Sequence, residues 1–111
     1  MLSKIRLSNF RCFEKVECFL DDNTTIIVGD NAQGKTTILE SVCLLMRLQS
    51  PRTSKIRDLI KIGQSNLAAE GLISDKKIIF SISGNKRKML VQEQIYTKRK
   101  DYLKETSHLR L

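Results

Sequence analysis

The sequence contains no tryptophan, one proline, one histidine and three cysteines among its 111 residues. The cysteines, Cys12, Cys18 and Cys43, form no CxxC pair and have no histidine nearby, which argues against a zinc site. The first residues include no apolar segment typical of a secretory signal. An odd number of thiols in such a chain fits a reducing compartment, so we expect a cytoplasmic protein with cysteines that serve as small buried hydrophobic groups.

Long hydrophobic runs are also missing, since none approaches the roughly 18 apolar residues of a membrane-spanning helix. Charged residues make up 29% and hydrophobic residues 41% of the chain, a balance that excludes a disordered tail. The length allows one domain with a modest core. Neither a membrane partner nor a large self-contained enzyme is therefore expected.

Acidic residues are scarce in the second half of the chain. Residues 1–50 carry six Lys or Arg and six Asp or Glu, whereas residues 51–111 carry fourteen and six. The whole net charge of +8 therefore belongs to the second half. Such an excess favours a polyanionic partner, either nucleic acid or an acidic surface. Charge alone does not distinguish this from a solvated surface that is rich in lysine.

The hydrophobic pattern of the first half predicts strands followed by a helix. Residues 5–13 and 16–20 are strand-like, the latter with clear alternation. Residues 24–28 form a β-branched run that is typical of a buried strand in a mixed or parallel sheet. Apolar residues then recur with helical spacing, which predicts a helix over residues 36–48 that is buried on most sides. Pro51 is expected to end it.

The second half predicts mainly antiparallel strands. A short helical turn is expected near residues 56–60, and an antiparallel meander over residues 67–92, with Gly71 as a bulge and Gly84-Asn85 as a hairpin turn. Residues 93–106 predict at most a weakly amphipathic helix. The sequence therefore predicts an α/β fold, in which a mixed sheet carries one helix and an antiparallel β-meander lies alongside.

One segment carries a chemical signature. Residues 29–36, Gly-Asp-Asn-Ala-Gln-Gly-Lys-Thr, match the P-loop pattern G-x-x-x-x-G-K-[ST] at every fixed position, between an expected strand and an expected helix. The glycines let backbone N–H groups point inward, and together with the helix N-terminus these form a site for phosphates. The alternative is a strand–helix turn that binds nothing. The candidate nucleotide-binding residues are Gly29, Asp30, Asn31, Ala32, Gln33, Gly34, Lys35, Thr36 and Thr37.

Three side chains of this segment have distinct expected roles. Lys35 would lie between the β- and γ-phosphates, and the hydroxyl of Thr36 would bind Mg²⁺. Thr37 would add a hydroxyl at the α-phosphate. A positive charge at a helix N-terminus opposes the helix dipole, so Lys35 is better explained by an anionic ligand than by stability. The loop alone does not separate ATP from GTP.

The loop and its flanks resemble those of SMC-like ATPases, and within that group they resemble the RecF family most. The opening segment, Ser8-Asn9-Phe10-Arg11-Cys12-Phe13, is similar to the Asn-Phe-Arg segment near the start of such proteins. Further similarity to RecF proteins lies in Ile38-Leu39-Glu40-Ser41, in residues 50–54 and 58–60, in Ala69-Glu70-Gly71 and in the lysine-rich hairpin at 86–88. The resemblance covers residues 1 to 92, with the P-loop as its most specific part.

The resemblance implies the N-terminal lobe of an ABC/SMC-like head, with ATP and Mg²⁺ as cofactors. Residues 1–111 would form this lobe, with the P-loop and helix in 1–50 and a basic connecting segment and meander in 51–111. Arg11 matches a position that reaches the nucleotide phosphates in SMC-like heads; the alternative is that it only solvates the end of the strand. The roles of Arg52 and Thr53 stay open, because a cation near a helix C-terminus is favourable by itself.

RecF proteins act in DNA replication, recombinational repair and the SOS response. The resemblance implies that two heads enclose ATP as a homodimer, bind DNA at single-strand gaps and work with other recombination mediator proteins. No Walker B Asp, catalytic Glu or Ser-Gly-Gly-Gln-like signature occurs in this sequence. The chain therefore resembles the first lobe only, as a fragment or truncated product, and nothing in it predicts hydrolysis.

Two basic clusters are candidate DNA contacts. They are Lys86-Arg87-Lys88 and Lys98-Arg99-Lys100, and Tyr96 and Tyr102 beside the second cluster would stack on bases. Alternatively, these residues only solvate a surface and cover the core.

Two other functions fit the same residues. Phage-defence nucleases of the overcoming-lysogenisation type begin with similar Asn-Phe-Arg and P-loop segments. A basic nucleic-acid-binding module could use the P-loop only as a turn.

Overall fold

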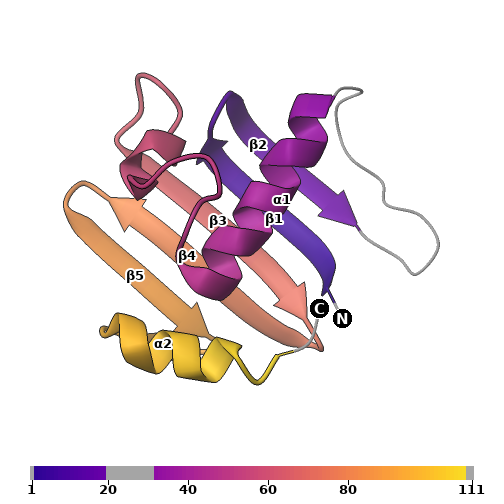
Figure 1. The fold of residues 1–111 in the computed structure, drawn as a ribbon, viewed down its shortest axis with the longest axis vertical. Helices are drawn as coiled ribbons and strands as arrows, with labels where there is room; N and C mark the ends of the chain where they lie inside the picture. Colours follow the sequence, from indigo (N-terminus) through magenta and orange to yellow (C-terminus); the bar gives the residue numbers. More distant parts are fainter. Residues whose placement is uncertain (1, 20–31, 110–111) are drawn as a thin grey trace.

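The computed structural model describes residues 2–19 and 32–109, and of residues 32–35 it describes the backbone only. The described part has two layers, a six-stranded sheet and helices (Figure 1). The sheet has the order β2-β1-β3-β4-β5-β6, with β1 Leu2–Phe10, β2 Phe13–Phe19, β3 Asn66–Ile73, β4 Lys76–Ser83, β5 Lys86–Val91 and β6 Gln94–Tyr96. The helices are α1 Ala32–Arg47, the short 3-10 helix η1 Ile56–Leu59 and α2 Arg99–Thr106.

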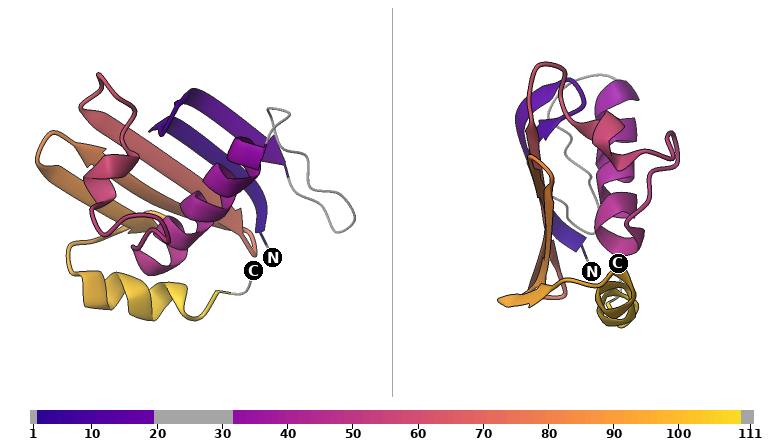
Figure 2. Two further views of the ribbon diagram at one scale, coloured as in Figure 1. Left: turned by 45° about the horizontal axis from the view of Figure 1, so that its top comes forward. Right: turned by 90° about the vertical axis from the view of Figure 1, so that its left-hand side faces the viewer.

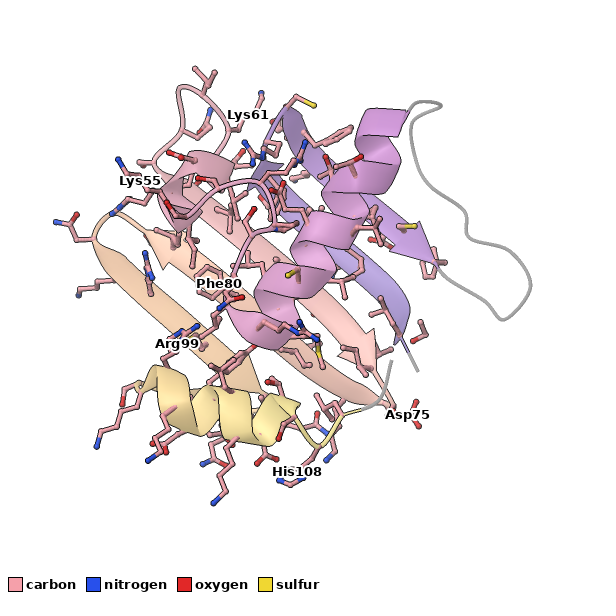
Figure 3. All side chains as sticks on the ribbon, viewed as in Figure 1. Lys55, Lys61, Asp75, Phe80, Arg99 and His108 are labelled. Atoms are coloured by element: carbon pink, nitrogen blue, oxygen red, sulfur yellow. The ribbon has the colours of Figure 1, made fainter. Side chains whose placement is uncertain are left out.

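The helices and the segment between α1 and β3 all cover the same face of the sheet (Figure 2). Side chains alternate along the strands, so every second residue faces these helices. The buried set on β4 is Ile78, Phe80 and Ile82, and Phe80 lies in the interior of the molecule (Figure 3). The core is therefore a single apolar layer between the sheet and α1, extended at one side by α2.

The predicted meander is confirmed, and the α/β class with it. Residues 66–91 form three antiparallel strands, with Gly84-Asn85 as the turn between Ser83 and Lys86. All neighbouring strands of the described sheet are antiparallel. The predicted strand at residues 24–28, which would make the sheet mixed, lies outside the described residues.

The central helix differs from the prediction at both ends. It begins at Ala32 and ends at Arg47, whereas the apolar spacing indicated residues 36–48. Leu48 takes a left-handed φ of 54° and donates its N–H to the carbonyl of Leu44, so the chain leaves the helix before Pro51. No helix in the described parts of the chain is long and apolar enough to cross a membrane.

Gly71 is not a bulge, so this prediction is wrong. It pairs in regular register with Ile5 on one side and Ile78 on the other, and the irregularity in this pair of strands lies between Leu2 and Lys4. A Cβ at Gly71 would come within 3.0 Å of the Leu45 side chain. The glycine therefore serves the close packing of α1 on the sheet.

Residues 93–106 are more ordered than the sequence indicated, with the short strand β6 before α2. Tyr102 is fully buried, and its hydroxyl donates a 2.5 Å hydrogen bond to the carbonyl of Leu45. It cannot stack on a base, so that prediction is wrong for Tyr102. Thr106 donates in the same way to the carbonyl of Met46 at 3.0 Å, and both bonds satisfy carbonyls in the last turn of α1.

The cysteines behave differently from one another. Cys18 is buried as expected and Cys43 is partly exposed, but Cys12 is exposed, contrary to the prediction, because it lies in the β1–β2 turn. Within residues 2–19 and 32–109, no group of His, Cys, Asp and Glu is arranged to hold a metal ion.

Candidate functional site

The turn between β1 and β2 brings Arg11 to one end of the sheet. Asn9 and Arg11 have left-handed φ values of 53° and 55°, a conformation that costs a non-glycine residue of order 1 kcal/mol or more. Two backbone hydrogen bonds stabilise this turn conformation. Arg11 N–H donates to the Leu59 carbonyl at 2.7 Å, and Lys61 N–H donates to the Asn9 carbonyl at 2.8 Å. The end of η1 and the residues that follow it therefore fix the direction in which Arg11 leaves the turn.

Glu40, in the middle of α1, is the partner of Arg11. Its side chain has no exposed surface, although it is charged. Arg11 donates from Nε to Oε1 and from Nη2 to Oε2, both at 2.9 Å. Arg52 donates from Nη2 to Oε1 at 2.6 Å and from Nε to Oε2 at 3.3 Å, and the Ser50 hydroxyl donates to Oε2 at 2.5 Å. Both arginines therefore bind the same carboxylate with two nitrogens each.

These contacts determine the charge state of Glu40. Burial alone would raise its pKa, but the hydrogen bonds from Arg11, Arg52 and Ser50 outweigh burial and lower the pKa to about 2. The hydrogen bond to Glu40 in turn raises the pKa of Arg11. Near neutral pH the cluster holds two guanidinium groups and one carboxylate, so it carries one unit of excess positive charge.

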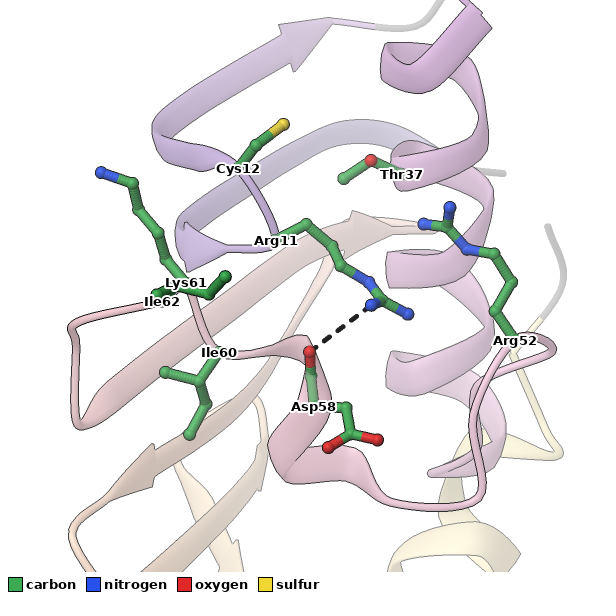
Figure 4. Close-up of a pocket in the computed structure, with 8 residues that line it drawn as sticks. All are labelled: Arg11, Cys12, Thr37, Arg52, Asp58, Ile60, Lys61 and Ile62. Carbon is green, nitrogen blue, oxygen red and sulfur yellow. Dashed lines mark hydrogen bonds between the residues drawn. The ribbon is translucent and has the colours of Figure 1, made fainter.

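The cluster lies beside a cavity of about 500 Å³. The cavity is lined by the β1–β2 turn, the second turn of α1 and the segment after α1, through Arg11, Cys12, Thr37, Arg52, Asp58, Ile60, Lys61 and Ile62. Figure 4 shows Arg11 extending toward this space from the β1–β2 turn and Arg52 from the segment after α1. Arg11 also donates from Nη1 to the backbone carbonyl of Asp58 at 3.5 Å. The site lies at the Lys61 end of the sheet, away from the β3–β4 turn at Asp75 (Figure 3).

The segment after α1 is shaped by short polar contacts. Ser50 accepts a hydrogen bond from the Arg52 N–H at 3.2 Å, and Thr53 donates to Asp58 Oδ2 at 2.7 Å. Such side-chain contacts to nearby groups favour tight turns over helix. Arg52 therefore points back to Glu40 in the middle of α1. The sequence had left open the alternative of a cation that only interacts with the dipole at the helix C-terminus.

The predicted nucleotide-binding residues are placed only in part. Gly29, Asp30 and Asn31 lie outside the described residues. Ala32, Gln33, Gly34 and Lys35 belong to the first turn of α1, where backbone N–H groups have no partner within the helix. Thr36 is partly buried, and Thr37 is 3% exposed and lines the cavity with Arg11.

The predicted DNA contacts are all on the surface. Lys86, Arg87 and Lys88 are exposed at the start of β5, and Lys98, Arg99 and Lys100 are exposed where α2 begins. Arg57, in η1, donates to the Gly84 carbonyl and to Asn85 Oδ1, so the hairpin tip is attached to the segment that lines the cavity.

Sequence reasoning missed Glu40 and Ser50. Glu40 is the only acidic residue between Asp30 and Asp58, and it lies in a helix predicted to be buried on most sides. A buried carboxylate requires cationic or hydrogen-bonding partners, so this position was a signal for the two arginines.

Comparison with known proteins places the chain in a family. The model of a family described as an AAA domain matches residues 4–110. The chain belongs to the AAA-domain family.

Its relatives include RecF proteins. The chain is 37% identical over 99 residues to the DNA replication and repair protein RecF of Exiguobacterium sp. (strain AT1b), which covers 84% of this chain and 27% of that protein. It is 34% identical over 84 residues to RecF of Bacillus thuringiensis (strain Al Hakam), covering 76% and 22%. The chain thus spans about a quarter of the length of these curated relatives.

Two solved structures have the same fold. The recombination mediator protein described as RecF-ATPrS in the RecFOR pathway has a TM-score of 0.81 and 29% identity, covering 93% of this chain and 29% of that chain. The structure described as RecF-ATP has a TM-score of 0.79 and 30% identity, covering 93% and 30%. The predicted resemblance to RecF and the predicted P-loop ATPase fold are confirmed.

Proposed function

We propose that the chain is the ATP-binding lobe of a RecF-like protein that acts in DNA replication, recombinational repair and the SOS response. The complete protein would bind DNA at single-strand gaps in an ATP-dependent manner. The observation that carries this proposal is the meeting of Arg11 and Thr37 on one cavity, beside the helix that contains the end of the P-loop. Similarity to structures described as RecF-ATP and RecF-ATPrS supports ATP as the ligand.

The donor set fits a magnesium–nucleotide complex. The backbone N–H groups at the start of α1 and Lys35 would hold the phosphates, and the excess positive charge at Arg11, Arg52 and Glu40 favours a polyanion. Thr36 would supply one oxygen ligand to Mg²⁺, which prefers hard oxygen donors and keeps several waters. The bound metal would neutralise phosphate charge.

Calorimetric titration of Mg-ATP into the chain, compared with the Lys35→Ala variant, tests the proposal. The wild type should bind and Lys35→Ala should not, because Lys35 supplies the charge between the outer phosphates. Lys15→Ala is the matched control, since Lys15 is exposed on β2 and its neighbours Glu14 and Val16 belong to no part of the site. Equal heats for wild type and Lys35→Ala would contradict the proposal.

DNA binding is the second part of the proposal. Six exposed basic side chains and the attachment of Arg57 to the hairpin support phosphate contacts at Lys86–Lys88 and Lys98–Lys100. Anisotropy of a gapped duplex, measured over a range of salt concentrations, tests it. Replacing Lys86, Arg87 and Lys88 by Gln should lower the salt slope by about 2 to 3, close to one unit per lost phosphate contact.

The matched control for DNA binding changes Lys76 and Lys77 to Gln. These lysines lie at the start of β4, at the other end of the strand from the hairpin. A salt slope that falls equally in both variants would indicate diffuse charge attraction and would contradict a specific role for the hairpin. DNA affinity that changes neither with ATP nor with Lys35→Ala would favour the alternative function, a basic nucleic-acid-binding module whose P-loop serves only as a turn.

The remaining properties are proposed for the complete protein by similarity to RecF. They are an ATP-enclosing homodimer, contact with other recombination mediator proteins and a cytoplasmic location. The same similarity favours RecF over a phage-defence nuclease, because both curated relatives above are RecF proteins.

A further inference from the structure

Glu40 joins three segments of the chain, namely the β1–β2 turn, α1 and the segment that follows α1. Its carboxylate receives donors from the β1–β2 turn through Arg11 and from the segment after α1 through Arg52 and Ser50. Five donors surround two oxygens that offer about four lone-pair sites, so the carboxylate is saturated. No freedom is left for Glu40 to turn without breaking several charge-assisted bonds.

This saturation restricts Arg11. Its Nε and one Nη2 hydrogen are committed to Glu40, and Nη1 faces the Asp58 carbonyl at 3.5 Å. The remaining N–H groups belong to a guanidinium that lines the cavity. A long arginine side chain would otherwise sample many rotamers, and fixing it before a ligand arrives lowers the entropic cost of binding.

We propose that Glu40 is a positioning residue, which holds the guanidinium of Arg11 in the orientation that contacts the nucleotide phosphates. Arg52 and Ser50 fix the orientation of the Glu40 carboxylate through their hydrogen bonds. The role rests on the proposed function, because it requires that the cavity takes a nucleotide. It assigns to Glu40 no contact with the nucleotide itself.

Charge alone predicts the opposite effect. Glu40 is negative and lies beside a cavity proposed to take a polyanion, so its neutralisation would strengthen ATP binding if only Coulomb attraction mattered. Positioning predicts weaker recognition of the phosphates when Glu40 is neutralised. The direction in which Glu40→Gln changes the preference for ATP therefore distinguishes positioning of Arg11 from simple charge attraction.

The test compares Mg-ATP with adenosine as competitors for a bound fluorescent ATP analogue, in wild type and in Glu40→Gln. The ratio of the two inhibition constants reports phosphate recognition, and a loss of folded protein does not change it. We expect the preference for ATP over adenosine to fall about tenfold, the value of one charge-assisted hydrogen bond. An unchanged or larger preference overturns the proposal.

The control and a double mutant sharpen the result. Glu17→Gln is the matched control, because Glu17 also lies between two cations, Lys4 and Arg6, but on β2 and away from the cavity. In an Arg11→Ala background, Glu40→Gln should have no further effect on the preference, since the residue through which it acts is gone. Additive losses would overturn the proposal.

Two further outcomes are decisive. If Glu40→Gln does not fold, Ser50→Ala removes one donor to Oε2 and should lower the ATP preference in the same direction; no change would overturn the positioning role. A wild-type chain that binds no Mg-ATP overturns the proposed function, and the positioning role with it. If the wild-type chain binds Mg-ATP and Glu40→Gln has the same preference for ATP over adenosine, only the positioning role is overturned.

Discussion

The stability of the chain should decrease in acid through Glu40, because the hydrogen bonds to its carboxylate require the ionised form. The folded state holds the pKa of Glu40 at about 2, against a usual value of 4.5. A carboxylate with a lowered pKa stabilises the fold above its unfolded pKa and loses that contribution as the pH falls toward the folded pKa. The two values correspond to about 3 kcal/mol at neutral pH, of which about 1 kcal/mol is lost by pH 3.5.

The assay is urea unfolding followed by circular dichroism, on wild type and Glu40→Gln, at pH 7 and pH 3.5. Other carboxylates also titrate in this range, so the informative quantity is the difference in unfolding free energy between the two proteins at each pH. That difference should shrink by about 1 kcal/mol from pH 7 to pH 3.5, because glutamine does not titrate. Glu17→Gln controls for the loss of a more exposed carboxylate.

A difference that stays constant between the two pH values would refute the reasoning. It would mean that the arginines stabilise the protonated and ionised forms of Glu40 equally, which a saturated ionic cluster cannot do. It would also remove the physical basis for a fixed Arg11. The experiment needs no ligand and is therefore independent of the proposed function.

Three further changes have expected outcomes. Tyr102→Phe leaves the buried Leu45 carbonyl without its donor and should lower the unfolding free energy by about 1 to 3 kcal/mol in thermal or urea unfolding. The control is Tyr96→Phe, at a partly exposed tyrosine, which should change the unfolding free energy by less than about 0.5 kcal/mol. Leu39 is 69% exposed on α1, and Leu39→Gln should reduce self-association in sizing chromatography, whereas an isolated chain that is already a monodisperse monomer would contradict this. Arg57→Ala detaches the hairpin from η1, and it should weaken DNA binding in anisotropy while the calorimetric ATP affinity stays the same.

Most of the sheet could be predicted because its signals are local. Alternation along Ile78, Phe80 and Ile82 fixes which face is buried, and Gly84-Asn85 fixes the hairpin. Gly71 was misread because a glycine in a strand indicates either a bulge or close packing, and only the position of Leu45 decides between them. That position depends on α1, which is distant in sequence.

The helix α2 shows a second limit. Its residues are mostly charged, so the hydrophobic pattern is weak, and much of what holds it is polar. Tyr102 and Thr106 donate to carbonyls that α1 cannot satisfy within itself. Such bonds depend on where another helix ends, and no spacing rule within residues 93–106 reveals them.

The site divides in the same way. The P-loop pattern and Arg11 could be proposed as nucleotide-binding residues from the sequence, because both belong to short motifs that resemble those of a known family. The grouping of Glu40 with Ser50 and Arg52 could not, since it depends on a turn that reverses the chain after α1 and returns it to the middle of that helix. What the sequence did contain was a single carboxylate in a helix expected to be buried.

The segment after α1 connects the two parts of the proposed function. Arg52 binds Glu40 beside the cavity, while Arg57, five residues later, binds the tip of the β4–β5 hairpin. Ser54 and Ile56 line a groove together with Arg99 at the start of α2. ATP-dependent DNA binding requires an element whose position affects both sites, since coupling is a difference in free energy between shared states. This segment lines the cavity, binds the hairpin tip just before Lys86 and shares a groove with Arg99 of the second basic cluster, so it is the element of the described chain through which such coupling would act.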